Sequence, residues 1–230
     1  MKAALLDIEG TIGDIAFVRD VLFPFARARL PDTLKSRWND QEVAASVQGA
    51  RQATGSKLAT PAEAAAQFLA WMDEDKKITP LKALQGIIWR EGYASGELKA
   101  HLYPDAVEAI RHWHRHGVQV FIYSSGSIEA QKLYLGHSVA GDLMPLIGGY
   151  FDTTTGSKGD TTSYTKIATA IDVEPFEMTF FSDAPAETDA AQAAGIAVYR
   201  IDRKKAPAFE GDDRGTPVIG SFAPVTGRLG

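Results

Sequence analysis

Four short runs of almost continuously apolar residues most constrain how this chain of 230 residues can fold. The runs are Ala3–Asp7, Val118–Ser124, Met178–Asp183 and Ala197–Ile201. Strands of a parallel sheet are covered on both faces and are apolar throughout, whereas strands with one solvent-facing side alternate apolar and polar residues. Helical patterns separate the later runs. The chain is therefore predicted to be an α/β protein with a doubly wound, mainly parallel, Rossmann-like sheet.

Residues 14–96 interrupt this alternation, because they contain helical patterns and no convincing strand. Apolar residues recur at helical spacing in 18–25 and in 65–72, and Thr60–Glu63 forms a capping box before the second stripe. We predict an all-helical cap domain at 14–96, inserted into a discontinuous α/β core of residues 1–13 and 97–230. We expect these stripes and the cap tryptophans to form its core. The tail beyond Lys204, rich in Gly and Pro, is predicted to be loop.

The composition excludes several classes of protein. The chain has 24 Lys and Arg against 29 Asp and Glu, a net charge of −5, and no basic block, which argues against binding of nucleic acid or anionic membranes. It has no cysteine, so disulfides, thiolate metal sites and cysteine nucleophiles are excluded. No apolar run approaches the roughly 18 residues of a membrane span. We expect a cytoplasmic protein, and a monomer because no long exposed apolar stripe is left over.

The first apolar run ends in two carboxylates, Asp7 and Glu9, in a loop that contains Gly10. At the carboxyl end of a strand in an open α/β sheet, such a pair projects into the crevice where ligands bind. One carboxylate can attack a substrate while its neighbour handles the proton. Taken alone, the pair is equally well explained as a solvated acidic turn.

The second apolar run ends in Ser124, Ser125, Gly126 and Ser127, just before a predicted helix. A hydroxyl followed by free backbone N–H groups at a helix N-terminus is suited to bind phosphate. A Ser-rich helix cap without a ligand is the commoner meaning of this composition. Ser124 and Ser125 are therefore candidate phosphate ligands, although this pattern by itself is a weak indication of phosphate binding.

Lys158 lies in a polar loop between the second and third apolar runs, before a crossover helix. The loop does not match a Walker motif, and a lone loop lysine is usually solvated. Its place at the ligand side of the sheet makes Lys158 the candidate cation. Lys166 is the competitor, ranked lower because it lies within the helix.

The third apolar run ends in Asp183, and Glu187 follows four residues later. Mg²⁺ takes oxygen ligands and often only one or two carboxylates, so Asp7 and Asp183 suffice as the charged anchors of one ion per monomer. Glu187 is left between two roles: it holds a metal-bound water, or it caps the next helix.

The order of these four features, carboxylate pair, hydroxyl, lysine and metal carboxylate, resembles the four motifs of the haloacid dehalogenase superfamily of phosphotransferases. The helical insert resembles that superfamily's cap. Longer stretches look like the bifunctional enolase-phosphatase family of methionine salvage, and they extend over nearly the whole chain to about Arg203: residues 7–11, 15–18, 22–25, 86–89, 123–127, 129–133 and 150–153. Glu9 makes the resemblance to this family specific, because most members of the superfamily carry aspartate at that position. Residues 12–14 depart from the hydroxyl-rich loop expected in the family.

The resemblance implies a Mg²⁺-dependent hydrolase of phosphoric monoesters acting on 2,3-dioxo-5-(methylthio)pentyl 1-phosphate. Asp7 would be the nucleophile and Glu9 the acid and base. Ser124 and the N–H of Ser125 would bind phosphate, and Lys158 would stabilise charge. Asp7, Asp183 and the Glu9 carbonyl would hold the metal. The base of the enolisation stays open between Glu9 and a cap residue.

Three alternatives remain at this point. The chain could be a phosphatase of the same superfamily that acts on another small phosphorylated metabolite without enolisation. It could be a non-catalytic phosphoacceptor of the receiver type, although Asp7 ends the first strand and a cap of some 80 residues follows, far beyond usual βα-loop lengths. It could be a metal-binding structural protein. A metal site of His112, His114 and His116 is disfavoured, since no carboxylate completes it and histidines suit a helix C-terminus.

Overall fold

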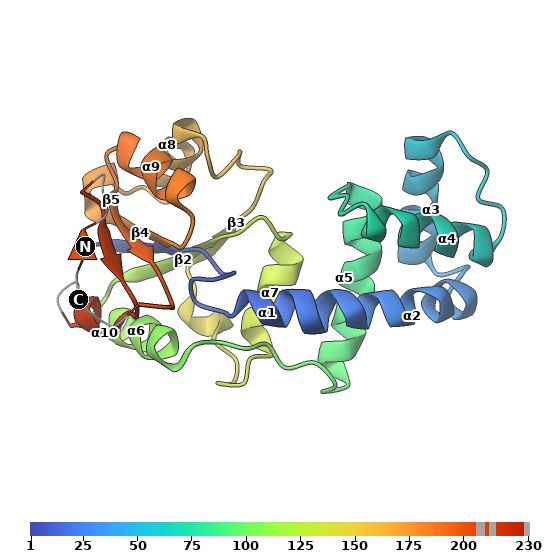
Figure 1. Cartoon of the computed structure of the whole chain (residues 1–230), viewed down its shortest axis with the longest axis horizontal. Helices are drawn as coiled ribbons and strands as arrows, with labels where there is room; N and C mark the ends of the chain where they lie inside the picture. Colours follow the sequence, from blue (N-terminus) through green and yellow to red (C-terminus); the bar gives the residue numbers. More distant parts are fainter. Residues whose placement is uncertain (206–209, 212–214, 228–230) are drawn as a thin grey trace. The chain divides into compact units, whose positions relative to one another are not determined.

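The sheet that the sequence predicts is present in the computed structural model, which describes residues 1–205, 210–211 and 215–227 (Figure 1). Within these residues one seven-stranded sheet has the order β3-β2-β1-β4-β5-β7-β6. All neighbouring strands pair in parallel except β6 and β7, which are antiparallel. The strands are β1 (Ala3–Leu6), β2 (Gln119–Tyr123), β3 (Gly149–Phe151), β4 (Met178–Ser182), β5 (Ala197–Ile201), β6 (Glu210–Gly211) and β7 (Pro217–Ile219). The predicted doubly wound, mainly parallel fold is confirmed.

Helices cover both faces of this sheet, which explains why its strands are apolar throughout (Figure 1). Alternate residues of β1 enter different layers. Leu5 belongs to a core cluster with Tyr164 and Ile167 of α8 and with Ala191 of α9. On the other face, Trp113 of α6 stacks on Phe181 at 5.2 Å between ring centroids. These helices are α6 (Pro104–Arg115), α7 (Ile128–Gly136), α8 (Thr161–Ala170), α9 (Pro185–Ala193) and α10 (Ala223–Thr226), with 3₁₀ turns η2 (Met144–Leu146) and η3 (Pro175–Glu177).

The chain divides into two compact units, Met1–Ile15 with Ala100–Gly230 and Ala16–Lys99. The expected boundaries, at 13/14 and 96/97, lie two to three residues from these. The second unit is built from helices around its own apolar cluster, which includes Phe68, Trp71 and Leu84, with Trp38 and Trp89 packed at its edge. The elements from the start of the insert are α1 (Ile15–Phe17), the π-helix η1 (Val18–Leu22), α2 (Phe23–Ser36), α3 (Gln41–Thr54), α4 (Pro61–Asp73) and α5 (Thr79–Ala94).

The apolar stripe at 18–25 is less buried than its helical spacing predicts. Leu22 is buried, but Val21 is 40% exposed. The reason is that residues 18–22 form a π-helix, whose hydrogen bonds close over five residues. A wider turn rotates successive side chains away from the positions that a period of 3.6 assigns to them.

The tail beyond Lys204 is not only loop. Residues 206–209, 212–214 and 228–230 lie outside the described residues, but the part between and after them contains β6, β7 and α10. Strands β3, β6 and β7 are two or three residues long, too short to produce a recognisable apolar run. Prediction of the tail as loop was therefore wrong for these segments.

No helix within the described residues is both long and apolar enough to cross a membrane.

Candidate active site

The candidate site lies where the order of the strands reverses. From β1 the chain proceeds outward to β2 and β3, and then returns to the other side of β1 to form β4. Leu6 pairs with Phe181, so Asp7 and Asp183 leave neighbouring strands at the same edge of the sheet. Ligands of open α/β proteins bind at this kind of switch point, outside the carboxyl ends of the strands.

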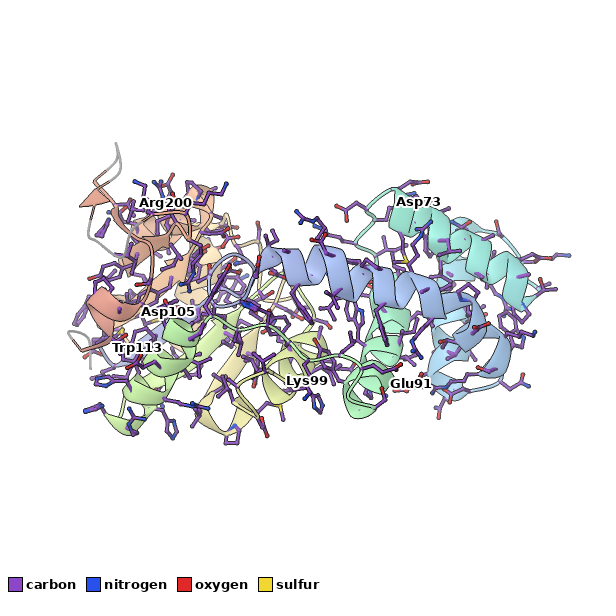
Figure 2. All side chains as sticks on the ribbon, turned by 60° about the horizontal axis from the view of Figure 1, so that its bottom comes forward. Asp73, Glu91, Lys99, Asp105, Trp113 and Arg200 are labelled. Carbon is purple, nitrogen blue, oxygen red and sulfur yellow. The ribbon has the colours of Figure 1, made fainter. Side chains whose placement is uncertain are left out.

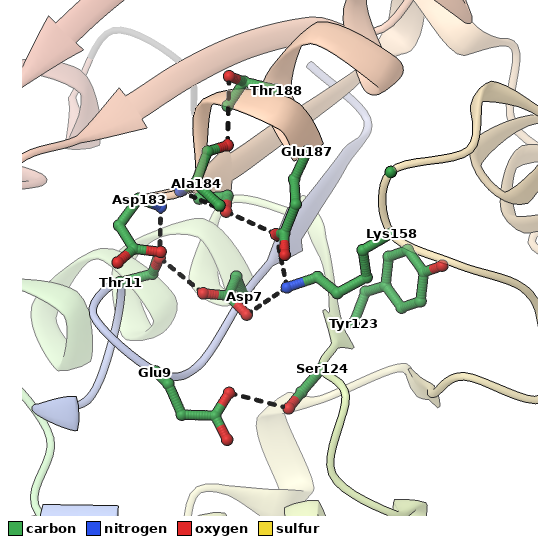
Figure 3. A network of polar contacts seen from close by, with 12 residues as sticks. Asp7, Glu9, Thr11, Tyr123, Ser124, Lys158, Asp183, Ala184, Glu187 and Thr188 are labelled. Atoms are coloured by element: carbon green, nitrogen blue, oxygen red, sulfur yellow. Dashed lines mark hydrogen bonds and ion pairs between the residues drawn. The ribbon is translucent and has the colours of Figure 1, made fainter. Parts of the chain in front are cut away.

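Asp7 is 3% exposed, and both of its carboxylate oxygens have partners (Figure 3). Lys158 donates to Oδ1 at 2.5 Å, and the hydroxyl of Thr11 donates to Oδ2 at 2.9 Å. Burial raises the pKa of Asp7 to about 7, against the lowering effect of Lys158, and the negative charges of Glu9 and Glu187 raise it further. Asp7 therefore needs positive charge beside it to stay ionised at neutral pH.

Lys158 lies between two carboxylates. Its ammonium group is 2.5 Å from Asp7 Oδ1 and 2.6 Å from Glu187 Oε2. Burial by itself lowers the pKa of Lys158, but Asp7 and Glu187 outweigh this effect and raise it. The ammonium group is therefore charged, and it points at the predicted nucleophile.

Two buried tyrosines hold the loop that carries Lys158. Tyr164 donates from its hydroxyl to the Lys158 carbonyl at 2.7 Å, and Tyr123 donates to the carbonyl of Gly156 at 3.0 Å. Lys166, the competing lysine, instead donates to the carbonyl of Thr155 at 3.4 Å and is exposed. The structure thus brings Lys158, and not Lys166, to Asp7.

Glu187 is in the first turn of α9, where the sequence left its role open. Its carboxylate accepts a hydrogen bond from the hydroxyl of Ser182 at 2.7 Å and pairs with Lys158. The amide of Ala184 is bound by the Ser182 hydroxyl at 3.2 Å. In these contacts the Glu187 carboxylate binds the side chains of Lys158 and Ser182, and the Ser182 hydroxyl, not Glu187, accepts from an amide at the helix N-terminus.

Glu9 and Ser124 lie side by side across the site, because β2 is the neighbour of β1 (Figure 3). The Ser124 hydroxyl donates to Glu9 Oε2 at 3.3 Å and also accepts from the amide of Gly126 at 3.2 Å. Ser124 is 1% exposed, whereas Ser125 is exposed. Ser127 caps α7 by accepting from the amide of Ala130.

Thr11 is the site residue that sequence reasoning missed. Its hydroxyl donates to Asp7 Oδ2 and accepts from the amide of Asp183 at 3.0 Å, so that it joins the ends of β1 and β4. It is completely buried. The signal was a hydroxyl four residues after a carboxylate in a tight Gly-containing loop, a spacing that allows the side chain to fold back.

The donor groups at this edge fit Mg²⁺. Asp7 and Asp183 offer carboxylate oxygens, and partial desolvation together with Glu187 raises the pKa of Asp183, as burial does for Asp7. Gly10 has a φ of +79°, and a Cβ there would lie 2.2 Å from Asp183 Oδ2. The backbone of the loop therefore packs directly against that carboxylate oxygen. The described residues contain no group of three or more His, Cys, Asp or Glu side chains placed to hold a metal. Two carboxylates, completed by backbone and substrate oxygens, are a common arrangement for Mg²⁺.

His112 of α6 and His116, the residue that follows this helix, contact each other. The rings of His112 and His116 stack with centroids 4.1 Å apart, and His116 Nδ1 is 2.8 Å from the carbonyl of His112. These contacts are local to one helix.

Residues 1–195 match the family of haloacid dehalogenase-like hydrolases. Among curated proteins, the chain is 49% identical to the enolase-phosphatase E1 of Alcanivorax borkumensis, over 90% of this chain and 91% of the relative. It is 47% identical to that of Pseudomonas fluorescens, over 98% and 97%. It is 49% identical to that of Aquifex aeolicus, over 89% and 91%.

Solved structures agree with this fold. The UTR4 protein of Saccharomyces cerevisiae superposes with a TM-score of 0.80 at 35% identity, covering 96% of this chain and 98% of that one. A phosphatase from Thermococcus onnurineus superposes with a TM-score of 0.63 at 16% identity and covers 100% and 98%, which supports the fold alone.

Proposed function

Since the chain belongs to the haloacid dehalogenase-like hydrolases, and among them to the enolase-phosphatases, we propose that it converts 2,3-dioxo-5-(methylthio)pentyl 1-phosphate to an acireductone and inorganic phosphate. The substrate is first enolised and then dephosphorylated. The observation that carries the proposal is the contact between Lys158 and Asp7, with Thr11 on the second carboxylate oxygen and Glu9 across the same opening.

Asp7 is the proposed nucleophile. One carboxylate oxygen attacks phosphorus, the bond from phosphorus to the substrate's bridging oxygen breaks, and an aspartyl-phosphate forms. Lys158 neutralises charge at the phosphoryl group as it is transferred. Attack requires the ionised form of Asp7, which the adjacent ammonium group favours against the effect of burial.

Glu9 is the proposed acid and base. Its proton goes to the leaving oxygen, and the carboxylate then takes a proton from the water that cleaves the aspartyl-phosphate, work that typically contributes about 10²- to 10⁴-fold in rate. Ser124 lies within hydrogen-bond distance of Glu9 and orients it. Ser124 and the amide of Ser125 are the proposed phosphate ligands. For the enolisation, Glu9 and a residue of the helical unit are both candidates for the base.

Mg²⁺ is the proposed metal, one ion for each chain, held by Asp7, Asp183 and the carbonyl of Glu9. When bound, it supplies positive charge that neutralises phosphate and polarises a carbonyl oxygen. We further propose that the protein acts on a small phosphorylated substrate in the cytoplasm, as a monomer that binds neither nucleic acid nor membranes. Gel filtration tests whether the protein is a monomer, and cell fractionation tests whether it lies in the cytoplasm.

The decisive experiment supplies the diketo phosphate with Mg²⁺ and follows enol absorbance and free phosphate together. Enol followed by phosphate is the expected result. Phosphate without an enol stage would instead indicate a phosphatase of another small metabolite, and Mg²⁺-dependent stabilisation without phosphate release would indicate a structural role.

Two variants make this experiment specific. Lys158→Met is expected to lower the rate of phosphate release by about 10²-fold or more, because charge on the transferred group is no longer neutralised. Lys166→Met is the matched control and is expected to leave the rate unchanged, since Lys166 is exposed and donates to the carbonyl of Thr155 instead of to Asp7. Equal rates in the two variants would contradict the role of Lys158.

A further inference from the structure

We propose that Arg203 is a positioning residue of this site, which acts by holding the backbone carbonyl of Thr11. The proposal rests on the proposed function for its assay. Arg203 follows β5 and lies outside the residues 1–195 that match the family. The part of the chain beyond residue 195 would thereby contribute to catalysis without touching the substrate.

The guanidinium group of Arg203 binds one carbonyl oxygen through two nitrogens. Nε donates to the carbonyl oxygen of Thr11 at 3.0 Å, and Nη2 donates to the same oxygen. Nη1 donates to Asp105 Oδ2 at 2.7 Å. The side chain is 14% exposed, so these bonds are largely shielded from water. A lysine has a single donor atom and could not reproduce this planar arrangement.

Thr11 links the position of its carbonyl to the Asp7 carboxylate and to the backbone of Asp183. Its hydroxyl donates to Asp7 Oδ2 and accepts from the amide of Asp183. Since Thr11 is completely buried, its side chain has little freedom to compensate for a shift of its backbone. Movement of the Thr11 carbonyl therefore changes the geometry at Asp7 and Asp183 together.

Arg203 is itself anchored by aromatic rings and by the C-terminal segment. Its guanidinium carbon lies 4.0 Å from the ring centroid of Tyr103 and 5.3 Å from that of Phe222. The amide of Phe222 donates to Asp105 Oδ2 at 2.7 Å, the same oxygen that Arg203 binds.

Phe222 is completely buried and packs against Trp113 and Phe181, with ring centroids 5.9 and 5.2 Å away. Figure 2 shows Asp105 at the start of α6 and Trp113 further along the same helix. A continuous series of contacts thus runs from the core between α6 and the sheet, through Asp105 and Arg203, to Thr11.

The test is a double-mutant cycle between Arg203→Met and Thr11→Val, assayed with the diketo phosphate and with p-nitrophenyl phosphate. We expect Arg203→Met to lower kcat about 10- to 100-fold with little change in KM, as is typical when a group that orients a catalytic residue is lost. In the Thr11→Val background the same substitution should have little further effect, because the hydroxyl that transmits it is already absent.

Further variants separate positioning from simple stability. Arg203→Lys keeps the charge and should recover only part of kcat; if Arg203→Met does not fold, the same cycle uses Arg203→Lys. Lys204→Met removes an exposed neighbouring charge and should match the parent. As a readout without turnover, the Mg²⁺ concentration that gives half of the thermal stabilisation should rise in the Arg203 variants.

An unchanged kcat, equal effects in both Thr11 backgrounds, or a rate loss that only follows the unfolded fraction would overturn the proposal. Failure of the proposed function has a different signature: the parent protein would release phosphate from p-nitrophenyl phosphate but form no enol, and the cycle could still be measured. If neither substrate reacts, the Mg²⁺ titration of the Arg203 variants decides.

Discussion

Asp7 combines two demands that conflict, because a buried carboxylate must be ionised to attack. Its 3% exposure excludes water from the reacting oxygen, and the same burial raises its pKa to about 7. The folded protein pays for this with stability, as functional sites commonly do. Lys158 reduces the cost, and the proposed metal would reduce it further.

The stability of the metal-free protein should therefore depend on Asp7 and on pH. The folded pKa lies above the ordinary value of 3.8, so between about pH 4 and 7 the native state binds more protons than the unfolded state. The free energy of unfolding then falls as the pH rises through this window. Asp7→Asn lacks this contribution, so its stability relative to the parent should increase with pH, by up to about 1.4 kcal/mol for each unit of pKa difference.

Urea unfolding of both proteins in chelator at several pH values measures this difference. A stability difference that does not change with pH would show that Asp7 titrates normally. The same Asp7→Asn variant should retain its fold and lose phosphate release, and unchanged turnover would exclude the covalent mechanism.

Gly10 offers a second prediction at the scale of single residues. Its φ of +79° is strained for other residues, and a Cβ would lie 2.2 Å from Asp183 Oδ2 and 2.7 Å from its Cγ. Gly10→Ala must therefore move the Asp183 carboxylate or the loop. We expect weaker Mg²⁺ binding and a kcat reduced about 10-fold or more. Gly96→Ala is the control, since φ is also positive there but nothing lies within 4 Å of its Cβ; equal effects would point to backbone strain alone.

At the scale of elements, the helical unit shows how local signals define a helix start. Thr60 accepts a hydrogen bond from the amide of Glu63 at 3.2 Å, as a capping box predicts. The Glu63 carboxylate, however, accepts from the amide of Ala59 at 2.7 Å and not from that of Thr60. The N-terminus of α4 is thus satisfied by a variant of the motif that extends one residue further back.

Loss of this cap should destabilise α4 without affecting the chemistry. Thr60→Ala is expected to cost about 1 kcal/mol in the free energy of unfolding, and Thr60→Ser much less, because Ser keeps the accepting oxygen. Chemical denaturation of the two variants measures the difference. Phosphate release at 25 °C should be unchanged in both, and equal stabilities would show that the Thr60 hydroxyl does not contribute.

At the scale of the whole molecule, the two ends of the chain meet at one site. The loop after β1 supplies Asp7 and Thr11, and the segment after β5 supplies Arg203, 192 residues later in the sequence than Thr11. Binding of a metal by Asp7 and Asp183 should stabilise the folded unit that joins these segments, because the unfolded chain does not hold the two carboxylates together.

Mg²⁺ should therefore raise the melting temperature. At 100 times its Kd the stabilisation is about 2.7 kcal/mol, which corresponds to a rise on the order of 5 °C for a chain of this size. Asp183→Asn should abolish most of the rise, and Na⁺ at equal ionic strength should not reproduce it. Differential scanning calorimetry with and without chelator measures both; the same rise in the variant would mean that the ion binds elsewhere.

The class of fold could be predicted from the sequence, because runs such as Ala3–Leu6 and Met178–Ser182 are almost continuously apolar, which is typical of strands covered on both faces. The sequence also predicted that Asp7, Lys158 and Asp183 lie at one edge of the sheet, because the carboxyl ends of parallel strands and the loops that follow them share that edge. The fold, and not a pattern of residues, places Glu187 against Lys158, the Thr11 hydroxyl against the amide of Asp183, and Arg203 against the Thr11 carbonyl. Each of these contacts joins residues far apart in the chain, and its geometry depends on packing, which no local pattern of residues encodes.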